Sequence, residues 1–239
     1  MGAKADRFNG FLPETAEFLN DLRANNNKPW FEAHRQDYQE YLIRPLQDLV
    51  ADLGGFMYAI DPLFELTPAV NKTISRIYRD TRFSRDKSPY KSAMWITFKR
   101  PGKDWKDAPA YFLEISPESY RYGMGFYGAS KETMDGLRKV IDEQPDRLEK
   151  ATDFYPKQQE FVIEGETYKK APGEDKPEHI MLWYRRKNLY LVCNREIDDR
   201  FFHKNLVEDL TRGFNLLAPL YRFLREVKDQ SARQTRRIR

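Results

Sequence analysis

Apolar residues recur at helical spacing at both ends of the chain and alternate with polar residues in its centre. Near the N-terminus, apolar positions three apart predict a short helix over residues 13–25. A longer apolar stripe predicts a second helix over 31–53. Pro45 should kink this second helix, and Gly54-Gly55 should end it.

The centre of the chain has the period of β-strands. The segments MWITF (94–98) and YFLEIS (111–116) are rich in β-branched and aromatic residues, and apolar side chains alternate over 120–126. Prolines and glycines between these segments mark turns. Three strands joined by short turns predict an antiparallel sheet.

Helical and strand patterns then mix before a long helical C-terminus. Ser130 should cap a helix that reaches Ile141. A short helix near 146–152 and strands at 161–163 and 189–193 follow. The C-terminal helical pattern runs from 198 to about 228, and breaks are expected at Gly213 and Pro219.

Helices first, strands in the middle and helices last are typical of an α+β protein rather than of alternating βαβ units. We expect a single domain over 1–239, with a central antiparallel sheet flanked by N-terminal and C-terminal helices. Its expected parts are N-terminal helices (13–53), a sheet region (74–128), helices and strands (130–193), C-terminal helices (198–228) and a basic tail (229–239).

The composition favours a globular protein of the cytoplasm. The 239 residues are 40% hydrophobic and include 16 Phe, 14 Tyr and 4 Trp, enough aromatic residues for a packed core. No apolar run approaches the roughly 18 residues that a membrane helix needs, so no membrane association is expected. One cysteine, Cys193, excludes an internal disulfide framework and a cysteine-rich zinc site.

Basic residues gather in two places on an otherwise acidic protein. The net charge is +4, yet residues 74–91 and 225–239 each hold six basic and two acidic residues, which leaves the rest of the chain acidic. Local positive charge of this kind attracts anions. It gives no information about the fold.

The first basic segment has the more regular pattern, with arginines at intervals of three. Guanidinium groups bind phosphate or carboxylate oxygens in pairs, so the pattern predicts a site for a small phosphorylated or carboxylated anion. In an extended polyproline-like segment, all four arginines would share one side. Asp80 and Asp86 would orient them. The candidate ligand-binding residues are Arg76, Arg79, Arg82, Arg85, Lys87 and Lys91.

Two other interpretations of this segment stay open. In one, the protein associates with nucleic acid through both basic segments; in the other, it is an interaction module whose arginines form a structural network with Asp80 and Asp86. Whether it is an enzyme is also open. The same two aspartates are the candidate acid–base groups, but neighbouring arginines should lower the pKa of each, which makes a poor base at neutral pH.

Other chemical motifs have simpler explanations. Residues 123–128 match the dinucleotide-binding pattern G-x-G-x-x-G, but the aromatic alternation and the lack of a βαβ unit favour a strand against which another backbone packs closely. His34, His179 and His203 lack metal-binding spacing, so no metal site is predicted. Cys193 reads as a core thiol. Ser84 and Ser88 read as turn or capping residues.

The segment RIYRDTRFSRDKSPYK (76–91) resembles the signature of the domain-of-unknown-function 2461 family, bacterial and fungal proteins with no established activity. The segments FLNDLRANNNKPWF (18–31), YGMGFY (122–127) and KKAPGEDKPEH (169–179) are also similar to that family, so the resemblance covers nearly the whole chain. Family members usually carry a basic residue between the proline and glycine that stand here as Pro172-Gly173. The resemblance implies a single α+β domain and directs attention to 76–91. It implies no reaction, cofactor or oligomeric state.

Overall fold

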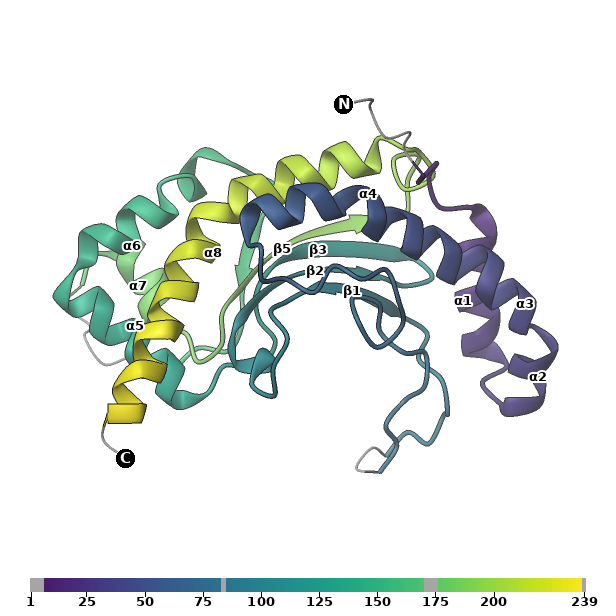
Figure 1. Ribbon diagram of the computed structural model, residues 1–239, viewed down its shortest axis with the longest axis horizontal. Helices are drawn as coiled ribbons and strands as arrows, with labels where there is room; N and C mark the ends of the chain where they lie inside the picture. Colours follow the sequence, from purple (N-terminus) through teal and green to yellow (C-terminus); the bar gives the residue numbers. More distant parts are fainter. Residues whose placement is uncertain (1–6, 83–84, 170–175, 238–239) are drawn as a thin grey trace. The chain divides into compact units, whose positions relative to one another are not determined.

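The computed structural model in Figure 1 describes residues 7–82, 85–169 and 176–237, with side chains described as far as Ser231. The chain forms two compact units. Unit 1 comprises Met1–Phe98, Phe112–Tyr122 and Asn194–Arg212, and unit 2 comprises Lys99–Tyr111, Gly123–Cys193 and Gly213–Arg239. Because the chain alternates between the units in six segments, no single cut separates them. One domain over the whole chain therefore stays the prediction.

The fold is α+β, as the sequence predicts, with an antiparallel sheet of five strands in the order β1-β2-β3-β5-β4. The strands are β1 (Met94–Phe98), β2 (Pro109–Ile115), β3 (Ser119–Phe126), β4 (Val162–Glu164) and β5 (Tyr190–Glu196). Every strand expected from the sequence is present, with ends displaced by a few residues at most. Along β1 buried residues alternate with partly exposed ones, which is the pattern that predicted it.

The glycines of β3 allow close approach of a neighbouring strand. A Cβ atom on Gly123 would overlap the Leu191 carbonyl oxygen of β5, and one on Gly125 would overlap the backbone at Leu189 and Tyr190. The pattern G-x-G-x-x-G is thus explained by backbone packing within unit 2. Gly128, the last glycine of the pattern, has no such neighbour.

The N-terminal helices belong to unit 1. They are α1 (Pro13–Ala24), α2 (Lys28–Ala33), α3 (Arg35–Asp37), the π-helical segment η1 (Tyr38–Ile43) and α4 (Arg44–Ile60). The expected end at Leu53 is wrong, because α4 passes through Gly54 and Gly55. Met57, one turn after Leu53, is completely buried, so its packing offsets the weak helix propensity of the two glycines.

The helices between β3 and β5 belong to unit 2. They are α5 (Lys131–Glu143), α6 (Pro145–Thr152) and α7 (Glu178–Tyr184), with short 3₁₀ turns η2 (Trp105–Asp107) and η3 (Tyr155–Lys157) elsewhere in the unit. The Ser130 hydroxyl caps α5 by accepting a hydrogen bond from the Thr133 N–H, as predicted. The sequence did not predict α7, whose five-residue apolar run shows no clear period. The rest of the expected loop 169–179 lies largely outside the described residues.

The C-terminal helix corrects two expectations. It begins later than predicted, since Asp198 starts a series of turns by accepting a hydrogen bond from the Arg200 N–H at 3.1 Å. From there α8 (Leu206–Arg237) runs without a break through Gly213 and Pro219. Pro219 and Asn215, whose carbonyl loses its partner, both lie on the exposed side, where water can bond that carbonyl. The side chains of the basic tail after Ser231 lie outside the described ones.

Candidate functional site

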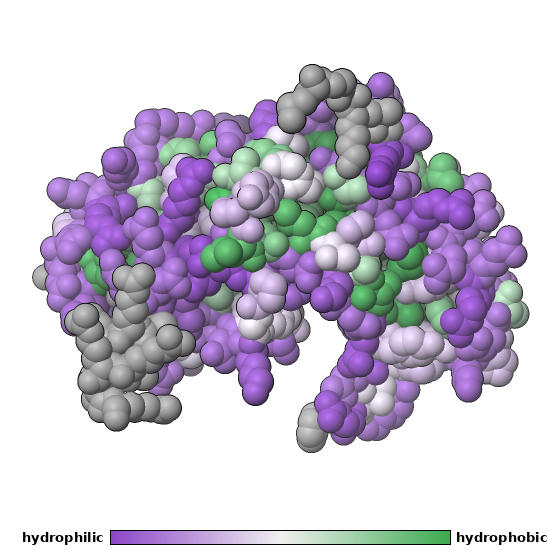
Figure 2. Space-filling model, viewed as in Figure 1, coloured by the Kyte–Doolittle hydropathy of each residue, from purple (hydrophilic) through white to green (hydrophobic). Residues whose placement is uncertain are grey.

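The arginine segment folds as a short antiparallel ladder in unit 1. Tyr78 and Tyr90 pair across it, the Arg79 N–H donates to the Pro89 carbonyl, and the Lys91 N–H donates to the Ile77 carbonyl, both at 2.8 Å. In such a ladder successive residues face opposite sides, so a step of three separates neighbouring arginines. The paired part of the segment, residues 77–79, therefore has the geometry of a β-ladder and not a polyproline-like one. The segment extends from β1 in Figure 1, and Figure 2 shows it as mainly hydrophilic.

The asparagine-rich junction after α1 holds this ladder in place. The Asn26 amide both donates to the Tyr90 carbonyl and accepts from the Tyr90 N–H, each at 3.0 Å. Asn27 caps α2 by accepting from the Trp30 N–H at 3.0 Å. Phe31 of α2 then stacks on Tyr90 with ring centroids 4.3 Å apart. These contacts bring α2 and the ladder together, although some 60 residues separate them in sequence.

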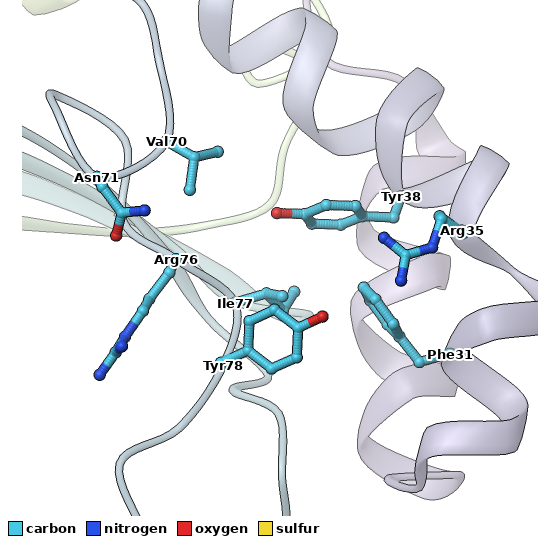
Figure 3. Close-up of a pocket in the computed structure, with 8 residues that line it drawn as sticks. All are labelled: Phe31, Arg35, Tyr38, Val70, Asn71, Arg76, Ile77 and Tyr78. Atoms are coloured by element: carbon cyan, nitrogen blue, oxygen red, sulfur yellow. The ribbon is translucent and has the colours of Figure 1, made fainter.

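A pocket of about 280 Å³ lies between these elements (Figure 3). Aromatic, aliphatic, amide and guanidinium groups all contribute to it. Arg35 and Tyr38 enter from the helices, Asn71 and Val70 from the loop before the ladder, and Arg76 lies at the edge with its guanidinium extending away from the rings. The lining residues are Phe31, Arg35, Tyr38, Val70, Asn71, Arg76, Ile77 and Tyr78.

Tyr38 reaches the pocket from the first position of the π-helical segment η1. Pro45 causes this widening, because it has no N–H for the Tyr41 carbonyl and its ring would clash with that carbonyl in an α-helix. The Thr15 hydroxyl of α1 donates to the Tyr41 carbonyl at 2.6 Å and replaces the missing hydrogen bond. A π-helical segment thus precedes Pro45, where a kink was predicted, and it changes the helical register just where Tyr38 enters the site.

The phenol of Tyr38 stays protonated at neutral pH. Burial, reinforced by the neighbouring Tyr78, raises the pKa of Tyr38 to about 12. Arg35 stays charged, because hydrogen bonds with the Glu32 carboxylate raise the pKa of its guanidinium. Its Nε and Nη2 atoms contact that carboxylate at 2.7–3.0 Å. The pocket thus presents a neutral hydrogen-bond donor and a permanent cation.

Asn71 is the one residue other than glycine with a positive φ among those described, at 66°. Its N–H donates to the Ile74 carbonyl at 2.8 Å, which fixes this left-handed turn. Asparagine tolerates such a conformation better than most residues. The turn directs the Asn71 amide into the pocket (Figure 3).

Three cations lie close together where the ladder meets the pocket. Lys91 donates from Nζ to the Arg76 carbonyl at 3.0 Å. Burial, followed by the positive charges of Arg76 and Arg79, lowers the pKa of Lys91. Positive groups that destabilise one another in this way are stabilised by an added anion.

The other predicted site residues either bond to groups of their own segment or face water. Arg79 pairs with Asp86, and Arg82 bonds Asp80 through Nη2 and Nε at 2.7 and 2.9 Å. Lys87 donates to the Thr81 carbonyl at 2.8 Å. Arg85 is exposed, and the described residues offer it no carboxylate. Of the predicted cations, the structure brings Arg76 to the pocket wall.

The two aspartates are exposed carboxylates with lowered pKa values. Hydrogen bonds from Arg82 hold the pKa of Asp80 well below its usual range. Hydrogen bonds from Ser88, then the charge of Arg79, lower the pKa of Asp86. Ser88 is thus a turn residue, as predicted, and Ser84 lies outside the described residues.

The remaining sequence candidates take structural positions. Cys193 is buried in β5, as predicted. His34 stacks on Trp30 at 4.0 Å, and His179 contacts Glu149 at 3.1 Å. Within the described ranges, no group of three or more His, Cys, Asp or Glu side chains is arranged to hold a metal ion.

Sequence reasoning missed most of the pocket. Arg35, Tyr38, Asn71 and Tyr78 were not among the predicted site residues. Tyr78 lies within the arginine segment and could have been noticed there. Arg35 and Tyr38 read as ordinary helix residues, and nothing in the sequence joins them to a segment 40 residues away.

The fold and the site define an α+β protein with an open pocket lined by aromatic rings and guanidinium groups. The chain belongs to the family described as Conserved hypothetical protein (DUF2461), whose model matches residues 14–223. That match confirms the resemblance noted in the sequence. Comparison with curated proteins gave no match. Across the described part of the chain, no helix has the length and apolar character to span a membrane.

Proposed function

We propose that this protein binds a small phosphorylated or carboxylated anion in the pocket between α2, η1 and the ladder. The observation that carries the proposal is Arg76. Among the described residues no carboxylate lies within ion-pair distance of it, whereas Arg79 and Arg82 on the same segment each have an aspartate. A guanidinium beside a pocket and without a carboxylate is suited to binding an anion in paired hydrogen bonds.

The surroundings of Arg76 support the same ligand class. Lys91 and Arg79 add positive charge nearby, as their effect on the pKa of Lys91 indicates. Arg35 supplies a second guanidinium to the pocket lining. The Tyr38 hydroxyl and the Asn71 amide offer neutral hydrogen bonds to the rest of a ligand, and the volume of about 280 Å³ suits a small molecule.

Binding is favoured over acid–base catalysis. Asp80 and Asp86 are the aspartates nearest in sequence to Arg76, and the lowered pKa of each keeps it ionised at neutral pH. A carboxylate of that kind is a weak base. We place the protein in the cytoplasm, where its one thiol, Cys193, suits a reducing environment.

A thermal-shift panel on the purified protein tests the proposal, with phosphate, sugar phosphates and dicarboxylates as probes. A probe present at 100 times its Kd should stabilise the protein by about 2.7 kcal/mol, a rise in Tm of roughly 5–10 °C. Arg76→Ala should abolish that rise, because it removes the paired hydrogen bonds. The measurement is the Tm of each variant with and without the probe.

Arg200→Ala is the matched control. Arg200 is also an exposed arginine of unit 1, but its nearest carboxylate is Asp198 at 3.9 Å and it does not line the pocket. The Arg200→Ala substitution removes the same charge as Arg76→Ala and should leave the ligand-induced rise in Tm intact. If both variants lose the rise equally, the effect is one of overall charge and the proposed site is wrong.

A further inference from the structure

We propose that unit 2 carries a second binding surface, distinct from the pocket, which binds single-stranded nucleic acid by stacking and by contacts to phosphates. It consists of Trp105 and Tyr127 with the lysines around them, and it uses neither of the two basic segments noted in the sequence. The proposal does not depend on the anion pocket, whose residues all belong to unit 1.

The two rings form an exposed aromatic pair. Tyr127 has 69% of its surface exposed, more than any other large hydrophobic residue among those described. Trp105 is half-buried, and the ring centroids lie 5.5 Å apart with planes inclined at 48°. A ring with this much exposed surface contributes little to the packing of its own unit. It offers a flat face on which another ring can stack.

Lysines lie directly over both rings. The Lys99 ammonium is 4.7 Å from the centre of the Trp105 ring, and the Lys106 ammonium is 5.1 Å from that of Tyr127. Each ring is therefore flanked by a positive charge, which places a phosphate-binding group beside each stacking position. Cations over rings also strengthen binding through cation–π attraction.

Part of the positive charge of this surface has no described carboxylate beside it. Residues 99–106 contain four basic residues and one acidic residue. Asp229 lies 3.6 Å from Arg100, but no described carboxylate pairs with Lys103 or Lys106. An exposed surface of this kind is complementary to a polyanion.

Hydrogen bonds of the side chains and the backbone fix the position of the aromatic pair in the unbound protein. Asp107, at the end of η2, accepts from the Ser130 N–H at 2.6 Å and from the Ser130 hydroxyl at 2.9 Å, and it pairs with Lys228. The Gly128 N–H, next to Tyr127, donates to the Lys106 carbonyl at 2.9 Å. The loops that carry the two rings are thus bonded to each other, which lowers the entropic cost of binding.

Single-stranded nucleic acid is the partner with matching chemistry. Its bases have free faces and its phosphates alternate with them, whereas the base faces of a duplex are already stacked inside the helix. A purely anionic partner such as an acidic peptide would bind the lysines and make no use of the rings. The exposed aromatic pair therefore favours a partner whose own flat rings can stack on it.

Fluorescence anisotropy with labelled 12-mers of dT and of rU tests the proposal on the full chain. Tyr127→Ala should weaken binding about 5- to 140-fold, the usual effect of losing one stacked base. Tyr58→Ala is the matched control, since Tyr58 is a tyrosine with 59% of its surface exposed that lies in the other unit. It should leave the affinity unchanged.

Salt dependence gives the second readout. Three phosphate contacts, from Lys99, Lys103 and Lys106, predict that log K falls with log salt with a slope of about −2, and Lys103→Ala should reduce it by about 0.7. The dT and rU arms distinguish DNA from RNA as the partner. Equal affinities of Tyr127→Ala and Tyr58→Ala, preference for a duplex of the same length, or no binding at low salt would each overturn the proposal.

Discussion

The arginines of the two units differ in both position and partners. Those of the ladder in unit 1 are dense in sequence and more exposed, at 29% for the Arg79 side chain and 76% for that of Arg82, and both bond carboxylates only a few residues away. Arg138 and Arg186 of unit 2 are at most 8% exposed and bond mainly to backbone carbonyls, although Arg186 lies between Arg185 and Lys187. A buried arginine needs several acceptors of its own, and backbone carbonyls supply them to Arg138 and Arg186.

The two buried arginines, Arg138 and Arg186, join segments that are distant in sequence. Arg138 of α5 donates from Nη1 to the Arg186 carbonyl at 3.0 Å and from Nη2 to Asp135 at 2.6 Å. Arg186 donates in turn to the carbonyls of Gly165 at 2.8 Å and of Leu182 at 3.2 Å. Burial, then the charge of Arg185, lowers the pKa of Arg186. Arg138 and Arg186 thus hold the helices and loops of unit 2 together, whereas Arg79 and Arg82 bond carboxylates of their own segment.

The sharpest test of this comparison is Arg138→Met. The substitution keeps the volume but leaves buried carbonyls without a donor, so the free energy of unfolding should fall by about 2–4 kcal/mol. For a chain of this length the Tm should fall by roughly 5–15 °C, measured by calorimetry. Arg138→Lys should recover part of the loss, because it restores the charge but not the forked geometry. A Tm equal to that of wild type would refute the distinction.

The half-buried pair of Asp107 and Lys228 should give an intermediate effect that depends on pH. Burial alone would raise the pKa of Asp107, but hydrogen bonds from Lys228, Ser130 and Thr133 outweigh it and lower that pKa. A carboxyl whose pKa is lower in the folded state stabilises the fold above its unfolded pKa of about 3.9 and loses that contribution as the pH falls through its folded pKa.

Urea denaturation at pH 6, 4 and 3 measures this contribution. The wild type should lose stability across the interval, and Asp107→Asn should be less stable at pH 6 by about 1–2 kcal/mol and fall less steeply. Parallel pH profiles for the two proteins would show that Asp107 contributes nothing of this kind.

The smallest effect is expected from Arg82→Ala. Both Arg82 and its partner Asp80 face water, where such pairs are screened and contribute little to folding. The Tm of this variant should not differ measurably from that of wild type. A clear loss of stability would place the ladder arginines among the structural ones and revive the interpretation of the segment as a structural network.

Much of the fold was predictable, because periodicity is a local property. Alternation in MWITF gave β1 with the correct ends, and three-residue spacing gave α1 nearly so. The errors have non-local causes. Gly54 and Gly55 remain helical because Met57 is buried beyond them, and α8 passes Pro219 because the lost hydrogen bond lies on its exposed side. The burial of a residue depends on residues distant in sequence, so it cannot be inferred from its neighbours along the chain.

The candidate site was predictable only where its chemistry is concentrated in sequence. The arginine run led to Arg76, but spacing could not tell it from Arg79 and Arg82, which differ by having an aspartate in reach. Arg35 and Tyr38 join Arg76 through the bonds between Asn26 and Tyr90. Such a long-range junction leaves no periodic signal.

The π-helical segment has a consequence for how this protein tolerates changes in chain length. A widened turn is equivalent to one residue inserted into an α-helix, and each residue of an α-helix advances it by about 100°. Deleting a single residue between Tyr38 and Pro45 would not remove the widening, because Pro45 would still deny a hydrogen bond to the carbonyl four residues before it, so the helix before the deletion would be rotated by that angle. Tyr38 would then leave the pocket, so in this stretch a one-residue gap is more damaging than most exchanges of side chain.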